Sequence, residues 1–316
     1  MAPPAIAPED FVQALYRTYL GRPADPAGLA YWAELIRSTG DPTSLLQGIL
    51  HSDEYRERGA DQDCTAEIKQ ALAGIQRRLR IVDVGAQALG AGSHAYEGLL
   101  NVCDDAEIIG FDPLEERLQE RARTEPGHRL TLLPYATGDG GTYTLYIANE
   151  DSNSSLFPLN EPHNARFNHI GQLRVVQTTR VKTHRLDDVL PEGPVDFLKL
   201  DVQGAELMTL QGAERVLSET AVVHCEVMFS PMYIGEPLFC DIQRHLISRK
   251  FELIDLIVST RYHYLTPSRR TTPDRLLWAD AVFFRETSNS ETRRVQALIA
   301  ASVYRKPTLA EYLLLE

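Results

Sequence analysis

Apolar residues in the first part of the chain recur every three or four positions, which predicts a compact set of short helices over residues 8–57. Asp25-Pro26 and Asp41-Pro42 each place a capping carboxylate before a proline, so we expect two of these helices to begin there. The positions expected to face a common core are Phe11, Leu15 and Tyr19, then Leu29, Trp32 and Ile36, then Leu45, Leu46 and Ile49.

The hydrophobic pattern changes near residue 80, where short apolar runs of strand length begin to alternate with helical stretches. Such alternation predicts a parallel sheet covered by helices on both faces. The fold class that we expect is therefore α/β, a doubly wound sheet with a small all-α domain at the N-terminus. The predicted strands are 80–85, 107–112, 130–136, 197–202 and 221–229, with two closing strands at 251–258 and 276–285.

Domain boundaries follow from the same change of pattern. A polar stretch at 59–63 separates the helical region from an amphipathic helix that leads into the first strand. We expect a helical accessory domain at 1–60, a linker helix at 61–80, a catalytic domain at 81–290 and a C-terminal helical extension at 291–316.

Composition and charge exclude several classes of protein. The 316 residues carry a formal net charge of −12, which argues against nucleic-acid binding because phosphate neutralisation needs clustered Lys and Arg. We find no signal peptide and no apolar run of the roughly 18 residues that span a bilayer. The four cysteines show no metal-ligand spacing, so we expect a reducing, cytoplasmic location.

The ends of the first two predicted strands carry candidate cofactor residues, since ligands of such sheets bind at the carboxyl ends of strands. Asp83 and Gly85 end the first strand, but the glycines that follow are wrongly spaced for a nicotinamide dinucleotide loop. S-adenosylmethionine has no phosphate and needs no such loop, and its ammonium suits Asp83, which could instead cap the following helix. Asp112 ends the second strand and either accepts hydrogen bonds from the ribose hydroxyls or starts a helix with Pro113.

The fourth and fifth predicted strands carry the candidate catalytic residues. Asp201 ends the fourth strand and Glu226 lies on the fifth, which we expect to be neighbours. If the ligand is S-adenosylmethionine and the reaction is methyl transfer to an alcohol, a group must remove the proton of the hydroxyl, and Asp201 and Glu226 are the candidates for that base. Alternatively these carboxylates hold a divalent cation such as Mg²⁺, although we assign no metal ligands. We expect Lys199 and Glu206 to form a framework ion pair and His224 to be a core residue.

A series of motifs in this region is similar to the FkbM family of methyltransferases. The motifs are DVGA, GFDP, PYATGDG, SNSSLF, KTHRLDDV, FLKLDVQGAEL and HCEVMFSPMY, in that order, and the match spans residues 81–285. The resemblance implies a Rossmann-like fold and S-adenosylmethionine-dependent O-methylation, commonly of sugars in polysaccharides or of secondary metabolites. The cofactor-binding residues that we expect are Asp83, Gly85, Ala86, Asp112, Pro113, Tyr135 and Ala136, the last two beside the adenine.

Two departures from the family pattern bear on the cofactor geometry. Many members have Glu before the proline where this chain has Asp112, which has a shorter reach. Many also have a simpler glycine-rich turn where this chain has AQALGAGSHAY.

The N-terminal region carries a second resemblance. FVQALYRTYLGRPADPAGLAYW, followed by LLQGILHSDEYRE, resembles a short helical domain that recurs in bacterial proteins beside enzymes of surface polysaccharides and secreted proteins. The resemblance allows a protein partner or self-association through this domain, although a packed bundle with no site is the simpler interpretation.

A polar insert at 140–194 separates the third and fourth predicted strands, and we expect most of it to be a solvated loop. Loops in this place tend to cover the acceptor site, and the family motif singles out Ser154 and Ser155 as substrate contacts. Tyr233, after the fifth strand, is the candidate aromatic platform for a sugar ring.

The function that we expect is O-methylation of a sugar hydroxyl in a bacterial glycan, with a glycan or small molecule as acceptor. Two alternatives stay open: an O-methyltransferase of a small secondary metabolite, and a methyltransferase-fold protein that mainly binds or assembles partners. The four residues Asp83, Gly85, Asp112 and Asp201 favour an enzyme. The glycine spacing disfavours a nicotinamide dehydrogenase.

Overall fold

The protein was analysed as a computed structural model, which describes residues 7–20, 22–39, 45, 48, 49, 64–88, 94–103, 105–125, 129–268 and 270–315. Its contacts divide the chain into two compact units. The first comprises Met1–Ala66 and Arg305–Pro307, and the second comprises Glu67–Tyr304 and Thr308–Glu316. The boundaries that we drew from the sequence stay predictions.

The first unit contains two long helices, α1 (Pro8–Leu20) and α2 (Pro26–Thr39). The Asp25 carboxylate accepts a hydrogen bond of 2.9 Å from the Gly28 amide, as expected of a cap before Pro26. The helices bury Val12, Tyr16 and Ala33, whereas Leu15, Leu29, Trp32 and Ile36 are half-buried around this core. Leu45 and Ile49 are also buried, and the rest of the predicted third helix, with Asp41 and Leu46, lies outside the described residues.

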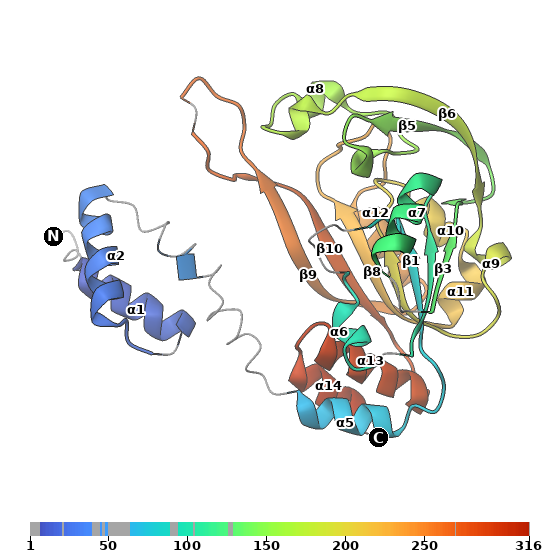
Figure 1. Ribbon diagram of the computed structural model, residues 1–316, viewed down its shortest axis with the longest axis horizontal. Coiled ribbons are helices and arrows are strands. Elements are labelled where there is room, and N and C mark those ends of the chain that lie inside the picture. The colour runs from blue at the N-terminus through green and yellow to red at the C-terminus, as the bar shows by residue number, and fades with distance from the viewer. Residues whose placement is uncertain are drawn as a thin grey trace. The chain divides into compact units, whose positions relative to one another are not determined.

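The second unit is built on a seven-stranded sheet with the order β3-β2-β1-β7-β8-β10-β9 (Figure 1). The first five strands are parallel, and β10 runs antiparallel to both of its neighbours. This order confirms a Rossmann-like doubly wound sheet and places the predicted first, fourth and fifth strands side by side. The strands are β1 (Arg80–Val84), β2 (Glu107–Phe111), β3 (Arg129–Leu133), β7 (Val195–Leu200), β8 (Thr220–Met228), β9 (Phe251–Tyr262) and β10 (Arg275–Arg285).

Helices cover both faces of this sheet. On one face a large apolar core joins β1, β7, β8 and β10 to the helices between β6 and β9. On the other face α13 contacts β7, β8 and α6, and eight consecutive residues of α13 from Val295 to Ser302 are buried. The helices of the unit are α5 (Thr65–Ala73), α6 (Glu97–Leu100), α7 (Glu115–Thr124), α9 (Leu186–Val189), α10 (Glu206–Gln211), α11 (Glu214–Ser218), α12 (Phe239–Ile247), α13 (Ser290–Ser302) and α14 (Pro307–Leu314).

The insert between β3 and β7 is ordered, so the expectation of a mainly solvated loop is wrong. It forms a three-stranded sheet of β4 (Ala136–Thr137), β6 (Val175–His184) and β5 (Thr142–Ala148). Short helical turns follow β5, namely η1 (Asp151–Asn153), α8 (Glu161–Asn164) and η2 (Ile170–Gln172). The turns bury Phe167, Ile170 and Leu173 against residues of β8 and β10, and this apolar packing, which spacing in the sequence does not reveal, orders the insert.

Strand register divides the polar residues of the central sheet into two rows on one face. Asp83 of β1 pairs with Lys199 of β7, and Lys199 pairs with His224 of β8. Asp201 and Glu226 lie two residues further along their strands, and side chains two residues apart share a face. We call Asp83, Lys199 and His224 the buried row, and Asp201 and Glu226 the rim row.

No helix among the described residues is long and apolar enough to cross a membrane.

Candidate active site

One cavity of about 520 Å³ opens at the carboxyl ends of the parallel strands, beside the insert. Its walls bring together Gly85, Asp112, Pro113, Tyr135 and Ala136 from the predicted cofactor set, Asp201 and Glu226 from the catalytic set, and Ser154 and Ser155 from the substrate set. Asp83, Ala86 and Tyr233 are not among the lining residues, and each is buried elsewhere.

The turn after β1 forms the floor of this cavity. Gly85 has a φ of +80°, and a β-carbon there would lie only 1.9 Å from the main-chain oxygen of Asp201. Glycine is therefore required both by the backbone conformation and by the close approach of β7. The Gly85 and Ala86 amides donate to the Phe111 carbonyl at 2.9 and 3.0 Å, and the Ala86 methyl group is fully buried behind the turn. Ala86 thus shapes the turn and does not line the cavity.

Asp112 lies where either of the two roles that the sequence left open would place it. Its carboxylate accepts a hydrogen bond of 2.7 Å from the Leu114 amide, next to the start of α7, and it also lines the cavity. Burial raises the pKa of Asp112, because hydrogen bonds from Leu114 and Gln87 only partly offset the loss of hydration. The Asp112 carboxylate can accept a hydrogen bond from a polar ligand group in the cavity.

An aromatic stack borders the third strand end. The rings of Tyr135 and His184 lie 4.2 Å apart at an interplanar angle of 24°. Tyr135 lines the cavity together with Ala136, Phe111 and Leu114. These side chains form a mostly apolar slot next to Asp112.

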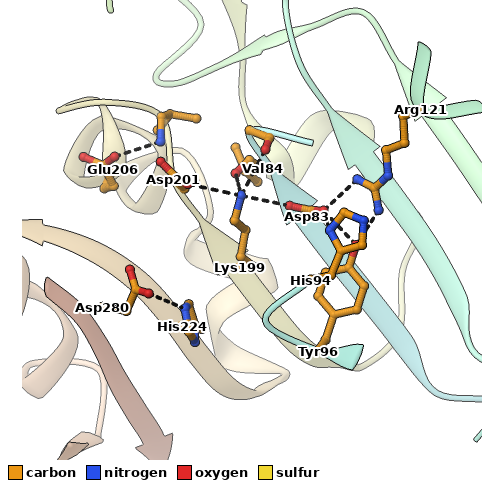
Figure 2. A network of polar contacts seen from close by, with 12 residues as sticks. Asp83, Val84, His94, Tyr96, Arg121, Lys199, Asp201, Glu206, His224 and Asp280 are labelled. Carbon is orange, nitrogen blue, oxygen red and sulfur yellow. Dashed lines mark hydrogen bonds and ion pairs between the residues drawn. The ribbon is translucent and has the colours of Figure 1, made fainter. Parts of the chain in front are cut away.

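Asp83 lies below this cavity in the buried row and not in its wall, which corrects the prediction that it contacts the cofactor. Its carboxylate is 2.7 Å from Arg121, 2.8 Å from the Tyr96 hydroxyl and 3.3 Å from the Lys199 ammonium. Figure 2 shows Arg121 and Lys199 approaching Asp83 from opposite sides, with His94 and Tyr96 next to it. Asp83 is 1% exposed, so this arrangement seals it from a ligand.

The buried row is a compensated cluster of charges. Burial alone would raise the pKa of Asp83, but the charges of Lys199 and Arg121 outweigh it and hold the pKa below its usual value. Burial would likewise lower the pKa of Lys199, yet Asp83 and Asp201 hold it above its usual value. Asp83, Lys199 and Arg121 are therefore all ionised at neutral pH, and each depends on the others.

The two carboxylates of the rim row accept hydrogen bonds from one side-chain amide. The Gln203 side-chain nitrogen donates to Asp201 at 2.9 Å and to Glu226 at 2.8 Å. The Gln203 side-chain oxygen accepts from the Tyr233 hydroxyl at 2.9 Å, which fixes the orientation of the amide. Gln203 has a φ of +54°, a conformation that non-glycine residues seldom adopt and that is often found at functional sites. The Lys199 ammonium lies 3.6 Å from Asp201 and links the two rows.

Glu226 and Glu206 retain protons more readily than ordinary carboxyl groups. Burial raises the pKa of Glu226 well above its usual value, and the charges of Asp201, Glu206 and Asp280 raise it further. Burial also raises the pKa of Glu206 to about 7. Glu206 accepts from the Val202 and Gly204 amides at 2.8 and 3.0 Å, so it holds the loop that carries Gln203. It does not pair with Lys199, and the expected framework ion pair is wrong.

Ser154 and Ser155 line the cavity, although both hydroxyl groups also contact the protein. Ser155 donates to the Gln203 carbonyl at 2.5 Å and accepts from the Phe157 amide at 2.9 Å. Ser154 accepts from the Ala148 amide at 3.2 Å. Ser155 therefore joins the insert to the loop of the rim row.

Tyr233 is fully buried, so it is no platform for a sugar ring. Its hydroxyl reaches Gln203 and the Asn153 carbonyl and positions the amide of Gln203. An aromatic wall exists nearby but comes from the last two strands: the rings of Tyr262 and Trp278 lie 5.5 Å apart and line the cavity with Met228 and Met232. We call this wall the acceptor end.

The sequence matches the methyltransferase FkbM domain over residues 83–253, more than half of the chain. The chain belongs to this family. Residues 5–58 match a domain of unknown function, DUF4214, which covers the helical region at the N-terminus. The chain is thus an FkbM-family methyltransferase with an additional helical domain.

One relative of this FkbM methyltransferase has a named activity, and its sequence is distant. The 2-O-methyltransferase NoeI of Sinorhizobium fredii is 27% identical over 165 residues, which cover 49% of this chain and 66% of that protein. The chain therefore spans just under two thirds of this relative.

Two solved structures align at low scores. Magnesium protoporphyrin IX methyltransferase from Synechocystis aligns with 90% of this chain and 100% of its own at 12% identity and a TM-score of 0.34. A putative methyltransferase from Thermobifida fusca aligns with 91% and 100% at 13% identity and a TM-score of 0.35. These TM-scores are too low to support an assignment of fold, which is identified here from the strand order of the central sheet.

Two further observations on the FkbM methyltransferase concern His224 and metal binding. His224 is buried, with the Tyr304 hydroxyl 3.2 Å and the Asp280 carboxylate 3.5 Å from its ring nitrogens, as expected of a core residue. Within the described part of the chain, no group of three His, Cys, Asp or Glu side chains is arranged to hold a metal ion.

Sequence reasoning missed Gln203, Tyr262 and Trp278 as site residues. Gln203 lies inside the KLDVQGAEL motif, so its place between the strand end and Gly204 was the available signal. Tyr262 and Trp278 gave no signal, because only the pairing of β9 with β10 brings them together.

Proposed function

We propose that this methyltransferase transfers the methyl group of S-adenosylmethionine to a hydroxyl oxygen of a sugar in a bacterial glycan. The observation that carries the proposal is the pair of carboxylates, Asp201 and Glu226, held by Gln203 at the end of a cavity that also contains the Gly85 turn and Asp112. A proton acceptor beside a donor cavity is what alcohol methylation requires.

The donor half of the cavity fits S-adenosylmethionine. The Asp112 carboxylate suits the two ribose hydroxyls, and the slot of Tyr135, Ala136 and Phe111 suits the adenine ring. Gly85 also lines the cavity, and we place the amino-acid part of the cofactor beside it. When bound, the cofactor supplies an electrophilic methyl group on a positively charged sulfur.

The rim row supplies the proton chemistry. Asp201 accepts the proton of the acceptor hydroxyl, and the Lys199 ammonium lies 3.6 Å from its carboxylate. Glu226, with its raised pKa, keeps a proton and can donate a hydrogen bond that orients the acceptor oxygen. Gln203 keeps both groups directed to the cavity, so that the acceptor oxygen is held in line for attack.

The acceptor end supports a sugar ring. Tyr262 and Trp278 offer aromatic faces, and the insert contributes the polar residues Asn153 and Ser154. Carbohydrates present alternating apolar faces and hydroxyl edges, which such a wall and rim can match. The name of the relative NoeI, a 2-O-methyltransferase, is consistent with O-methylation.

Calorimetry with S-adenosylhomocysteine tests the donor site. We expect one site per chain, and Asp112→Ala should weaken binding by about 1–3 kcal/mol because ribose hydroxyls lose their acceptor. Asp274→Ala, which removes the same charge from an exposed position of the β9–β10 hairpin, is the control and should bind like the wild type. Absence of binding by the folded wild-type protein would refute the proposal, and an unchanged affinity of Asp112→Ala would leave Asp112 as a helix cap.

A chelator resolves the alternative in which a divalent cation takes part. Loss of activity with EDTA and its recovery with Mg²⁺ would assign the rim row to metal binding, whereas activity that resists EDTA would assign it to direct proton transfer. A cytoplasmic location and a partner for the N-terminal helices stay predictions.

A further inference from the structure

Two arginines without an acidic partner meet beside the acceptor end. Arg166 follows α8 in the insert, and its guanidinium contacts the ring of His163, including Nε2 at 3.4 Å. The same Nε2 atom of His163 also lies 2.8 Å from the Ser230 hydroxyl. Arg275, at the start of β10, lies 3.4 Å from the same hydroxyl. We call Arg166, His163, Ser230 and Arg275 the cationic corner.

Within the described part of the chain, no carboxylate lies within ion-pair distance of the cationic corner. Among the described residues no ion pair is formed by Arg166 or Arg275, although most other buried or half-buried cations of the second unit have one. Burial and the charges of Arg166 and Arg275 lower the pKa of His163, so its ring is neutral at pH 7 and accepts a hydrogen bond from Arg166. Two guanidinium groups held around one neutral ring in a chain of net charge −12 form an uncompensated positive site.

The corner borders the acceptor end of the cavity. Arg275 pairs with Tyr262 across the β9–β10 ladder, and paired residues on antiparallel strands share a face. Ser230 lies between Met228 and Met232, and Tyr262 and both methionines line the cavity. Arg166 is exposed and Arg275 is half-buried, so both side chains are accessible from solvent.

Charge is thus segregated along the site. Four carboxylates line the cavity, those of Asp112, Glu150, Asp201 and Glu226. Arg166 and Arg275 lie outside this lining, and Arg275 is paired with Tyr262 of the aromatic wall. An acceptor with a negative group at one end is repelled by the carboxylates and attracted by the arginines, which leaves its hydroxyl end toward Asp201. Guanidinium groups bind phosphate and carboxylate through paired N–H donors.

We propose that the cationic corner binds an oxyanion, phosphate or carboxylate, on the acceptor, so that the enzyme selects an acidic sugar and fixes its orientation. The inference rests on the proposed function in that it takes the acceptor to be a sugar. It adds a specificity site that is separate from the donor site and the rim row.

The test uses the full chain loaded with S-adenosylhomocysteine and three probes, namely glucose, glucose 6-phosphate and glucuronate. Dissociation constants are measured by ligand-observed NMR at fixed ionic strength. We expect at least one anionic sugar to bind about ten-fold more tightly than glucose, a usual scale for a charge-assisted contact. A preference for glucose 6-phosphate identifies phosphate as the group recognised, and a preference for glucuronate identifies carboxylate.

Variants locate the effect. Arg166→Gln and Arg275→Gln should each reduce the preference for the anionic sugar while S-adenosylhomocysteine affinity stays within about two-fold of the wild type, a difference of less than 0.5 kcal/mol. Arg275→Lys, which keeps the charge, should retain part of the preference. Arg270→Gln removes an exposed arginine from the same hairpin and should retain all of it.

Two results would overturn the inference: equal binding of all three sugars to the wild type, or a preference that survives in both Arg166→Gln and Arg275→Gln. Failure of S-adenosylhomocysteine to bind the folded wild type would instead count against the proposed function. The two failures are therefore distinguishable in the same set of measurements.

Discussion

The buried row and the rim row share a face of the same sheet, and the rim row lies two positions further along the chain from Lys199 of β7 and His224 of β8. In the buried row Asp83 is paired with Arg121 and Lys199, and its pKa is held low. In the rim row Asp201 and Glu226 share one amide, and the pKa of Glu226 is raised. Identical chemical groups thus differ in state because one row is compensated by cations and the other is rich in acids.

The difference shows how one sheet separates stability from chemistry. A buried carboxylate with two cationic partners contributes to folding, and removing it leaves buried charges without a partner. A carboxylate at the strand end, beside a cavity and a like charge, is adjusted for proton exchange and contributes less to folding. Lys199 touches Asp83 and Asp201 and belongs to both arrangements.

The largest expected effect is on stability, from the buried row. Asp83→Asn removes the buried carboxylate between Arg121 and Lys199, which then keep only the partly exposed carboxylates of Glu125 and Asp201. The change should lower the free energy of unfolding by about 3–5 kcal/mol, measured by urea denaturation. Asp105→Asn, at an exposed ion pair with Arg78 and Arg129, is the control and should leave the urea midpoint nearly unchanged.

Should Asp83→Asn not fold, Tyr96→Phe removes one hydrogen bond from the same carboxylate and should cost about 1 kcal/mol. An Asp83→Asn protein of wild-type stability that has lost S-adenosylhomocysteine binding would contradict the comparison and return Asp83 to the cofactor site.

The next effect is on turnover, from the rim row. Asp201→Asn keeps the shape of the side chain but cannot accept a proton, so turnover should fall about 100-fold or more with little change in S-adenosylhomocysteine affinity. Glu226→Gln keeps a hydrogen-bond donor and should be milder. Formation of S-adenosylhomocysteine from the cofactor and an acceptor found in the sugar screen measures both. A milder loss in Asp201→Asn than in Glu226→Gln would exchange the two roles.

The smallest effect is a pH dependence of stability near the rim row. Burial raises the pKa of Glu236 from 4.5 to about 8, and the charge of Glu206 adds to the shift. The folded state therefore holds a proton that the unfolded state has lost, so the free energy of unfolding falls as pH rises from 4.5 through 8.

Glu236→Gln should flatten this decline, seen as a smaller change of the urea midpoint between pH 6 and pH 9. The variant keeps an oxygen that can accept from the Tyr233 amide, as Glu236 does at 3.0 Å. Equal slopes for the variant and the wild type would show that the Glu236 carboxyl is hydrated.

Local pattern was sufficient to predict the sheet. The seven strands of the central sheet followed from apolar runs such as those ending at Val84 and Leu200, because buried parallel strands are short and apolar throughout. The adjacency of β1, β7 and β8 followed from the usual strand order of doubly wound sheets. The β5 and β6 strands were missed, because they are half-exposed and polar residues such as Thr178 and Arg180 occupy them. Their pairing, and the apolar packing beneath the insert, depend on contacts that are distant in the sequence.

The site was predicted in part for a related reason. A strand end can be identified from sequence, so Gly85, Asp112 and Asp201 were placed correctly in the cavity wall. The register between neighbouring strands cannot be identified in this way. Asp83 was therefore expected in the cavity wall, whereas it lies in the buried row below the cavity. Burial of Tyr233 and the meeting of Tyr262 with Trp278 depend on tertiary packing, which leaves no local signal.

The Ser155 hydroxyl that bonds to the Gln203 carbonyl has a consequence for exchange of parts between relatives. Hydrogen bonds join the insert to the loop that carries Gln203. Ser155 of the insert donates to the Gln203 carbonyl, and the Tyr233 hydroxyl contacts both Gln203 and Asn153 of the insert. Transplanting an insert from another family member to change the acceptor would therefore also displace the proton acceptor, unless the residues at 203 and 233 move with it. If the insert and the rim row act as proposed, exchanging the insert changes acceptor choice and reaction rate together.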